Sequence, residues 1–203
     1  MKFKCITILV FQLLLLSCSN TISSVKKEYT LKSASKIKSA WNIDSKEWSL
    51  KNDTLIGNGG PMHWGVIMSK KDLPENYEIN FKVNMTKESL FEVMLNTDKE
   101  NYIRTYLYQI DQNMIIGKGT YHKNNDEYGK RGGPTLLKKA IELTNNKWYG
   151  VTIKVINNQL SFSVDNKMLE CSLVEKNLSQ KGKIGFITNG EVKVTDLNIK
   201  TIE

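Results

Sequence analysis

The chain has 203 residues and carries 29 lysines and arginines against 21 aspartates and glutamates, a formal net charge of +8. The basic residues are spread along the sequence and no nucleic-acid-binding motif is present, so the positive charge alone does not indicate a nucleic-acid partner. The three cysteines and two histidines form no cluster with metal-ligand spacing, which excludes the common zinc sites.

The first 17 residues have the three parts of an export signal. Lys2 and Lys4 supply the positive start, and Ile6–Leu16 forms an apolar stretch. This stretch is shorter than the about 20 residues of a transmembrane helix and has the length of a signal-peptide core. Residues 15–18, Leu-Leu-Ser-Cys, resemble the lipobox of bacterial lipoproteins, in which the chain is cleaved before the cysteine. The resemblance implies that Cys18 is lipidated; the alternative is an ordinary secretory signal with an incidental cysteine.

Residues 18–40 form a polar segment rich in serine and lysine, which we interpret as a flexible tether behind the lipid anchor. A charged first helix is the alternative, but apolar residues do not recur here at helical spacing. The lysines of the segment suit attraction to anionic lipid head groups. Ser19 stands where many inner-membrane lipoproteins have an aspartate, so we expect a lipid-anchored protein of the cell envelope, on the outer membrane where there is one.

The remainder, residues 41–203, has the size of one domain and the period-two alternation of β-strands. Apolar and polar residues alternate over Tyr77–Val83, Val151–Val155 and Leu160–Val164, which predicts antiparallel strands with one buried face. Asn157-Asn158 predicts a tight hairpin turn between the last two, and Asp165-Asn166 predicts another after them. Further strands are predicted at Thr54–Gly57, Trp64–Met68, Leu90–Asn96, Tyr102–Gln109, Met114–Thr120, Lys183–Thr188 and Val192–Ile199.

Connections rich in Gly, Asn and Asp separate these strands, among them Gly57–Gly60 and Asn189-Gly190, and Leu136–Leu143 is the one segment with helical character. Many short strands between turn signals predict an all-β fold: about ten to fourteen strands in a two-sheet antiparallel jelly-roll sandwich. Cys5 leaves with the signal, and Cys171 alternates with apolar neighbours. We therefore expect a buried strand thiol and a domain without a disulfide.

Several stretches of this domain resemble the concanavalin A-like lectin/glucanase superfamily. They are Trp48–Leu55, Pro74–Phe81, Lys147–Val155 with Asn158–Asp165, and Gly182–Ile187 with Val192–Ile199. Within the superfamily, the chain is most similar to the 3-keto-disaccharide hydrolase domains found in bacterial lipoproteins. The resemblance covers residues 41–203 and implies a curved jelly roll whose concave face meets carbohydrate.

Retaining family 16 enzymes of this superfamily carry Glu-x-Asp-x-x-Glu on one strand, with two carboxylates that act as nucleophile and acid/base. No such run is present here. Leu90–Asn96 has Glu92 as its one acid, and Tyr102–Gln109 has none. The sequence thus excludes two-carboxylate hydrolysis of that kind.

Four residues on one side of the strand Tyr102–Gln109 suit a sugar ligand: Tyr102, Arg104, Tyr106 and Tyr108. Aromatic rings stack on the apolar face of a sugar, and an arginine donates hydrogen bonds to its hydroxyls. Glu92 and Asn96 share a face of the preceding strand, and would lie beside this row if the two strands pair. The alternative is ordinary sheet packing, with Arg104 paired to a neighbouring acid.

Two loops add candidates. The turn after Gly57 carries His63 and Trp64, and the polar stretch between Thr120 and Pro134 carries His122 and Arg131. The two histidines are the simplest general bases near neutral pH, although each can equally be a solvated surface residue. Asp126 and Glu127 could contribute to a structural calcium site of the kind some superfamily members have, but no EF-hand pattern is present. No other cofactor is expected.

These features support a first hypothesis, a glycan-processing hydrolase with His122, His63 and Glu92 as catalytic candidates. The candidate sugar contacts are Trp64, Asn96, Tyr102, Arg104, Tyr106, Tyr108 and Arg131. A second hypothesis is a non-catalytic carbohydrate-binding lipoprotein, supported by the missing carboxylate motif. A third is a structural envelope protein that binds another protein. The expected partners are carbohydrate and, through the lipid, a membrane.

Overall fold

The structure, a computed structural model, describes residues 25–30, 34–43, 46–60, 64–121 and 133–202, with side chains from Ile37 onward. Its elements, in chain order, are β1 Val25–Thr30, α1 Ala34–Ala40, β2 Trp41–Asn42, β3 Trp48–Lys51, β4 Thr54–Gly59, β5 Gly65–Asp72, β6 Tyr77–Met85, β7 Leu90–Asp98, β8 Asn101–Tyr108, β9 Asn113–Thr120, β10 Thr135–Ala140, β11 Trp148–Ile156, β12 Gln159–Val164, β13 Lys167–Ser172 and β14 Lys183–Ile202. The predicted all-β jelly-roll sandwich is confirmed.

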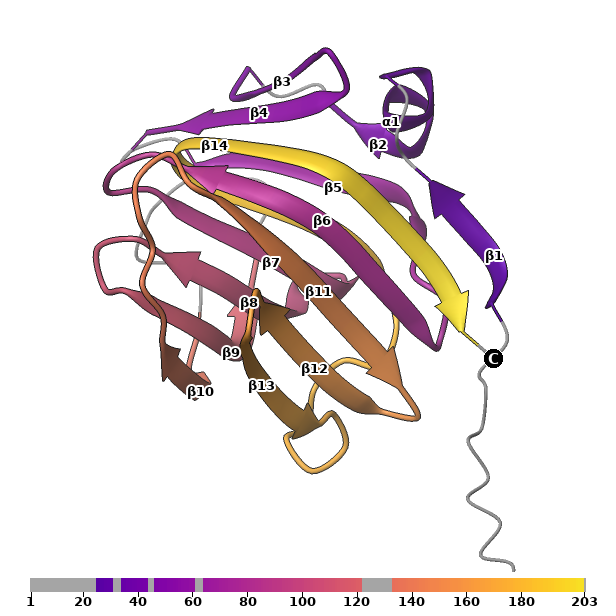
Figure 1. Ribbon diagram of the computed structural model, residues 1–203. Helices are drawn as coiled ribbons and strands as arrows, with labels where there is room; N and C mark the ends of the chain where they lie inside the picture. Colours follow the sequence, from indigo (N-terminus) through magenta and orange to yellow (C-terminus); the bar gives the residue numbers. More distant parts are fainter. Residues whose placement is uncertain (1–24, 31–33, 44–45, 61–63, 122–132, 203) are drawn as a thin grey trace, which may run out of the picture.

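The strands form two antiparallel sheets that share β14 (Figure 1). In the first sheet, β14 pairs with β6 along one edge and with β1 and β4 along its other edge. Beyond β6 the strand order is β11, β12 and β13, and beyond β4 it is β3. In the second sheet, the order is β10-β9-β8-β7-β14-β5-β2. In Figure 1 the first sheet lies in front of β7, β8 and β9.

β14 replaces the two strands expected on either side of Asn189-Gly190. Residues 183–189 of β14 pair with β7 in the second sheet, and residues 190–194 pair with β4 in the first. Gly190 has a φ of 86°, and a Cβ there would lie 2.8 Å from the Cβ of Ser89. Glycine is needed at this position because the chain turns from one sheet into the other in a left-handed conformation.

The core between the sheets is built by the predicted alternation. The inward-facing residues of β6, β11 and β12, such as Ile79, Ile153 and Phe162, are 0–3% exposed, whereas most of their neighbours along each strand face outward. Phe186 lies at the centre of an aromatic cluster. Its ring centroid is 4.9 Å from that of Trp41, 5.4 Å from Phe91 and 5.8 Å from Phe81.

The predicted hairpin turns are present. Asn157 and Asn158 have φ of 50° and 61° between paired residues Ile156 and Gln159, as a two-residue turn of this kind requires. Asp165 has a φ of 48° in the next turn. Gly57–Gly60, by contrast, is not only a connection, because β4 continues through Gly59. Gly57 leaves room for its neighbours, since a Cβ on it would lie 2.6 Å from Thr188 and 2.8 Å from the Trp48 ring.

Two expectations about local structure are wrong. The segment expected to be helical, Leu136–Leu143, begins as strand β10, because pairing with β9 satisfies its backbone and overrides a weak local preference. The range expected to be a tether, residues 18–40, contains β1, which pairs with β14, and α1. Ile37 is 2% exposed and lies one helical turn before Trp41, so this pair attaches α1 to the core.

Cys171 on β13 is a buried thiol, as predicted, 9% exposed and free. Burial raises the pKa of this thiol, which disfavours the reactive thiolate. The residue therefore acts as a small apolar side chain of the core rather than as a nucleophile.

Glu78 on β6 connects three strands of the first sheet. Its carboxylate lies 2.8 Å from Lys154 Nζ on β11 and 3.8 Å from Lys200 Nζ on β14, and it accepts a 2.6 Å hydrogen bond from Asn80. Burial raises the pKa of the Glu78 carboxyl, but the hydrogen bonds and charges of its partners outweigh burial, so the pKa lies below its ordinary value. The ionised form is thus stabilised in the folded state.

Because the pKa of Glu78 is lower in the folded than in the unfolded chain, its contribution to stability is complete above the ordinary glutamate pKa of about 4.3 and is lost as the pH falls through the lower folded-state value. We expect Glu78→Gln to be less stable than wild type at neutral pH and to lose less stability on acidification. Melting temperatures measured from neutral pH into the acid range test this, with exposed Glu142→Gln as the control. Equal acid sensitivity of wild type and Glu78→Gln would contradict it.

Candidate functional site

The candidate site is the outer face of the second sheet, the side of β7, β8 and β9 that is turned away from the first sheet. Strands β7 and β8 pair, with Glu92 opposite Tyr106 and Met94 opposite Arg104. The row of Tyr102, Arg104, Tyr106 and Tyr108 therefore lies beside Glu92, as expected if the two strands form a hairpin. The residues between them, such as Val93 and Leu107, point into the core instead.

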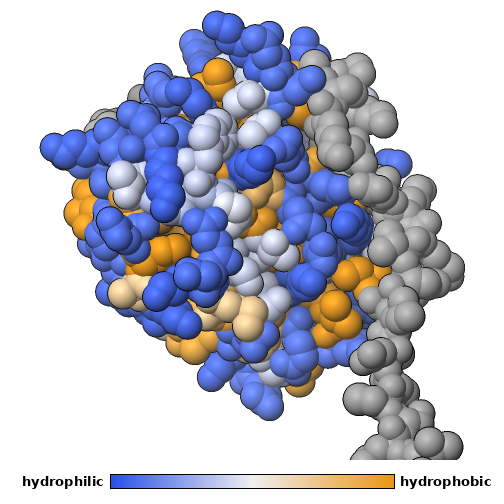
Figure 2. All heavy atoms as spheres, viewed as in Figure 1, coloured by the Kyte–Doolittle hydropathy of each residue, from blue (hydrophilic) through white to orange (hydrophobic). Residues whose placement is uncertain are grey.

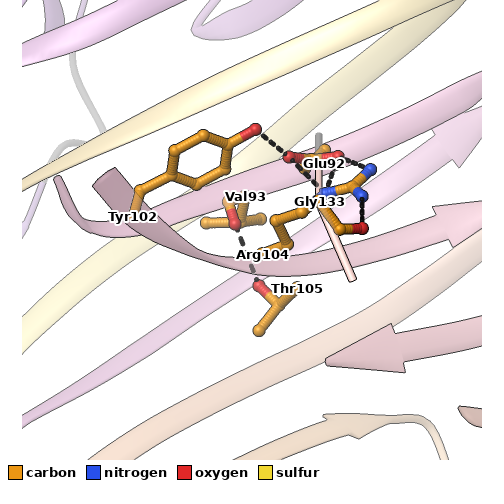
Figure 3. A network of polar contacts seen from close by, with 6 residues as sticks. All are labelled: Glu92, Val93, Tyr102, Arg104, Thr105 and Gly133. Atoms are coloured by element: carbon orange, nitrogen blue, oxygen red, sulfur yellow. Dashed lines mark hydrogen bonds and ion pairs between the residues drawn. The ribbon is translucent and has the colours of Figure 1, made fainter. Parts of the chain in front are cut away.

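A buried ion pair stands at the centre of this face (Figure 3). The Glu92 carboxylate, on a residue 1% exposed, accepts hydrogen bonds from Arg104 Nη2 at 2.8 Å and from Arg104 Nε at 3.1 Å. A second residue, Tyr102, donates a hydrogen bond from its hydroxyl to Glu92 Oε1 at 2.6 Å. Both carboxylate oxygens are engaged within the protein, so in this structure Glu92 holds Arg104 and Tyr102 in place.

Arg104 also contacts the backbone at Gly133 and the ring of Tyr106. Its Nη1 donates to the backbone carbonyl of Gly133 at 3.2 Å, and its guanidinium carbon lies 4.6 Å from the centre of the Tyr106 ring. Burial disfavours the charged guanidinium, but the Glu92 carboxylate outweighs burial, and the pKa of Arg104 lies above its ordinary value. Arg104 therefore positions Tyr106 and the chain at Gly133, and its nitrogens are largely used within the protein.

Glycines on β9 make room for this arrangement. Gly119 lies opposite Tyr102, and a Cβ on it would be 2.2 Å from the Tyr102 ring. Gly117 lies opposite Arg104, and a Cβ there would be 2.7 Å from the carbonyl oxygen of Pro134. Sequence reasoning missed these two residues. The signal was the spacing of Gly-Lys-Gly, which puts both glycines on one face of a strand.

A small apolar cluster covers the neighbouring part of the face. Met94, Tyr102 and Ile187 are 0–3% exposed, and the partly buried Trp64 and Tyr121 pack against them. Ile187 and Met94 belong to adjacent strands of the second sheet. This cluster is separate from the core between the sheets and gives the face an apolar base.

Asn96 does not join the row. A bulge in β7 with a φ of 50° at Asn96 turns its side chain away from the face. Its Oδ1 accepts a buried 3.0 Å hydrogen bond from the hydroxyl of Tyr77, a core residue, and its Nδ2 donates to the Ser179 carbonyl at 2.9 Å. The expected sugar contact is instead a link between strand β7 and the chain before β14.

Several aromatic side chains remain accessible on this face. Trp64, Tyr106 and Tyr108 are each partly exposed. Burial raises the pKa of the Tyr106 hydroxyl, although Arg104 beside it and a hydrogen bond with Thr135 act in the opposite direction. Tyr106 is therefore a neutral ring and hydroxyl at physiological pH, fixed in place on the cation beneath it.

His63, His122 and Arg131 lie outside the described residues, as do Asp126 and Glu127 of the suggested calcium site. Among the residues that the structure describes, no three His, Cys, Asp or Glu side chains lie together so that they could hold a metal ion. In the same described residues, the search for helices long and apolar enough to cross a membrane finds none.

Solved structures share this fold. The carbohydrate-binding module CBM66 from Bacillus subtilis aligns over 80% of this chain and 96% of its own, with a TM-score of 0.63 and 10% identity. A Bacillus subtilis protein with a galectin-like fold aligns over 89% and 99%, with a TM-score of 0.64 and 12% identity. A family 16 endo-glucanase from Bacteroides ovatus aligns over 87% and 99%, with a TM-score of 0.59 and 13% identity.

The chain therefore has the concanavalin A-like jelly-roll fold that its sequence predicts. At these identities the likeness defines the fold and not the activity. No protein-family model and no curated protein matches the sequence.

Proposed function

We propose that the protein is a lipid-anchored envelope protein that binds carbohydrate on the outer face of the second sheet. The observation that carries this proposal is the row of partly exposed aromatic side chains, Trp64, Tyr106 and Tyr108, beside the buried Glu92–Arg104 pair. Aromatic faces bind the C–H face of a sugar ring, and the tyrosine hydroxyls exchange hydrogen bonds with its hydroxyls.

The frame beneath the aromatic row supports binding because it is already ordered. Glu92, Arg104 and Tyr102 hold one another through hydrogen bonds of 2.6–3.1 Å, and Arg104 in turn lies against the Tyr106 ring. Because the ring is already ordered, binding loses less conformational entropy, which raises the affinity for a ligand that stacks on it. The fold neighbours include a protein named as a carbohydrate-binding module and one named as an endo-glucanase, which agrees with this ligand class.

A second candidate function is hydrolysis of 3-keto-glycosides, for which the sequence resemblance argues. With Glu92 engaged by Arg104, the acid–base chemistry would come from His122 or His63. Tyr121 and Trp64, which directly neighbour them in the sequence, pack onto the apolar cluster of this same face. Arg131 would then be a further substrate contact.

For the anchor, we propose that Cys18 carries the lipid and that the mature chain is held at the cell envelope, on the outer membrane where one is present. Two or more acyl chains anchor a protein stably, at about 0.8 kcal/mol for each buried CH₂. Globomycin-sensitive processing and metabolic labelling with a fatty acid test this directly. Loss of both with Cys18→Ala supports the anchor, whereas unchanged labelling of that variant rules it out.

The ligand is identified by a glycan array combined with a hydrolysis screen that includes 3-keto sugars, using the mature chain. We expect binding to at least one glycan. His122→Ala then separates the two functions: lost turnover with retained binding shows catalysis, while binding without turnover in wild type shows a non-catalytic module. Neither binding nor hydrolysis across both screens would contradict the proposal.

Substituting Tyr106 tests the site itself. We expect Tyr106→Ala to weaken binding of the selected glycan about tenfold or more, because it removes the stacking surface, while Tyr106→Phe retains most of it. The melting temperature should change less than for a core aromatic residue because the side chain is partly exposed. Calorimetric titration measures the affinities, with exposed Met168→Ala on β13 as the control. Equal affinity of Tyr106→Ala and wild type would place the sugar elsewhere.

A further inference from the structure

The first sheet also has a distinctive outer face, on the opposite side of the sandwich. A shallow hollow of about 400 Å³ opens there, lined by Lys82, Trp148, Tyr149, Gly150 and Thr195. The lining residues come from β6, β11 and β14, which pair side by side. Figure 2, which views this side of the molecule, shows residues of intermediate hydropathy in the middle of the face with hydrophilic residues around them.

Gly150 forms the floor of the hollow. A Cβ built on Gly150 meets only the Asp165 carboxylate, at 3.6 Å, so a side chain would fit without strain. The backbone does not need glycine there, unlike at Gly190. The effect of glycine at this position is an open space on the sheet surface, which a large side chain would occupy.

Trp148 forms one wall of the hollow. It is 43% exposed, whereas Trp41 and Trp48 are 2–3% exposed in the core. A large aromatic side chain beside an open glycine offers a flat apolar surface to a ligand, and tryptophan is enriched at binding surfaces.

Lys82 is the charged residue of the lining, and its partner Asp196 directly follows Thr195 in the chain. Lys82 Nζ lies 3.1 Å from the Asp196 carboxylate, and both side chains are more than half exposed. The register of β14 shifts between Thr195 and Asn198, and Asp196 has a φ of 56°, a left-handed conformation that aspartate adopts more readily than most residues. Such bulges re-aim side chains and are over-represented at functional sites. Here the bulge accompanies a carboxylate set beside Lys82.

We propose that this hollow is a second carbohydrate site, which takes one pyranose ring. The apolar face of the ring stacks on Trp148 and the ring occupies the space over Gly150. Lys82 donates hydrogen bonds to its hydroxyls, and the Thr195 hydroxyl exchanges hydrogen bonds with them. The paired opposite charges favour a neutral sugar over an anionic one.

This site is separate from the aromatic face of the second sheet and does not rest on it. Two sites on opposite faces let one molecule bind two glycan strands, or two points of one strand, and raise the overall avidity without new contacts.

The test uses the full chain in detergent with the substitution Tyr106→Ala, which weakens sugar binding on the outer face of the second sheet. The probes are the methyl pyranosides of glucose, galactose, mannose and N-acetylglucosamine, followed by saturation-transfer NMR and calorimetry. We expect at least one to bind with a Kd on the order of 1 mM. Trp148→Ala and Gly150→Leu should each weaken this binding about tenfold or more, and Trp148→Phe should retain it.

Gly150→Leu should leave the melting temperature unchanged, since its Cβ has room, so a loss of binding in that variant reports a filled hollow and not a damaged fold. Binding by none of the four sugars, or binding that survives both Trp148→Ala and Gly150→Leu, overturns the proposal. Neither result bears on carbohydrate binding by the aromatic face of the second sheet, which the glycan array tests separately.

Discussion

Replacing Arg104 with alanine is expected to lower the free energy of unfolding by about 3–5 kcal/mol, because it leaves the Glu92 carboxylate buried without its counter-ion. Glu92 is 1% exposed and takes three of its hydrogen bonds from Arg104. For a solvent-exposed arginine, by contrast, the same substitution would change the free energy of unfolding little. Denaturant unfolding of wild type and Arg104→Ala measures the difference.

A double substitution separates the buried charge from the packing. We expect Glu92→Leu combined with Arg104→Met to recover much of the stability lost by Arg104→Ala, since no unpaired charge remains. Tyr102→Phe, which removes one hydrogen bond to Glu92, should cost about 1–2 kcal/mol. An Arg104→Ala variant with wild-type stability would show that the Glu92–Arg104 ion pair is not formed in solution.

Replacing Phe186 with alanine is expected to destabilise the protein by about 3–5 kcal/mol, through lost apolar burial and the cavity left behind. Phe186 is fully buried and its ring contacts Trp41, Phe81 and Phe91, which come from β2, β6 and β7. The substitution therefore loosens both sheets at once. Chemical denaturation monitored by tryptophan fluorescence follows the effect, because Trp41 stacks directly on Phe186.

Two substitutions serve as controls for Phe186→Ala. Phe186→Leu keeps most of the volume and should cost clearly less. Ile110→Ala removes an apolar side chain that is 54% exposed and should change the stability by less than about 0.5 kcal/mol. A loss for Phe186→Ala no larger than for Ile110→Ala would mean that the aromatic cluster is not the centre of the core.

The fold was predictable from the sequence because its determinants are local. The alternation over β6, β11 and β12 places apolar residues between the sheets, and Asn157-Asn158 sets the register of one hairpin. The continuous β14 was not predictable, since Gly190 is equally suited to an ordinary turn. The same holds for β10, whose strand conformation depends on pairing with β9 and not on its own residues.

The candidate site was predicted in part. The common face of Glu92, Tyr102, Arg104 and Tyr106 follows from period-two spacing together with pairing of the two strands. The engagement of Arg104 by Glu92 could be named only as an alternative, because side-chain geometry decides it. Asn96 was misplaced for a related reason: a single bulge shifts the alternation and turns the side chain from the face to the interior.

Mapping a bound glycan by amide and indole NMR tests the central proposal most directly. With the glycan selected on the array, we predict chemical-shift changes concentrated at Trp64, Tyr106 and Tyr108 and at their neighbours on β7–β9. Intermolecular contacts between the sugar and the Tyr106 ring should accompany them. Saturating glycan that leaves these residues unperturbed would contradict carbohydrate binding on this face.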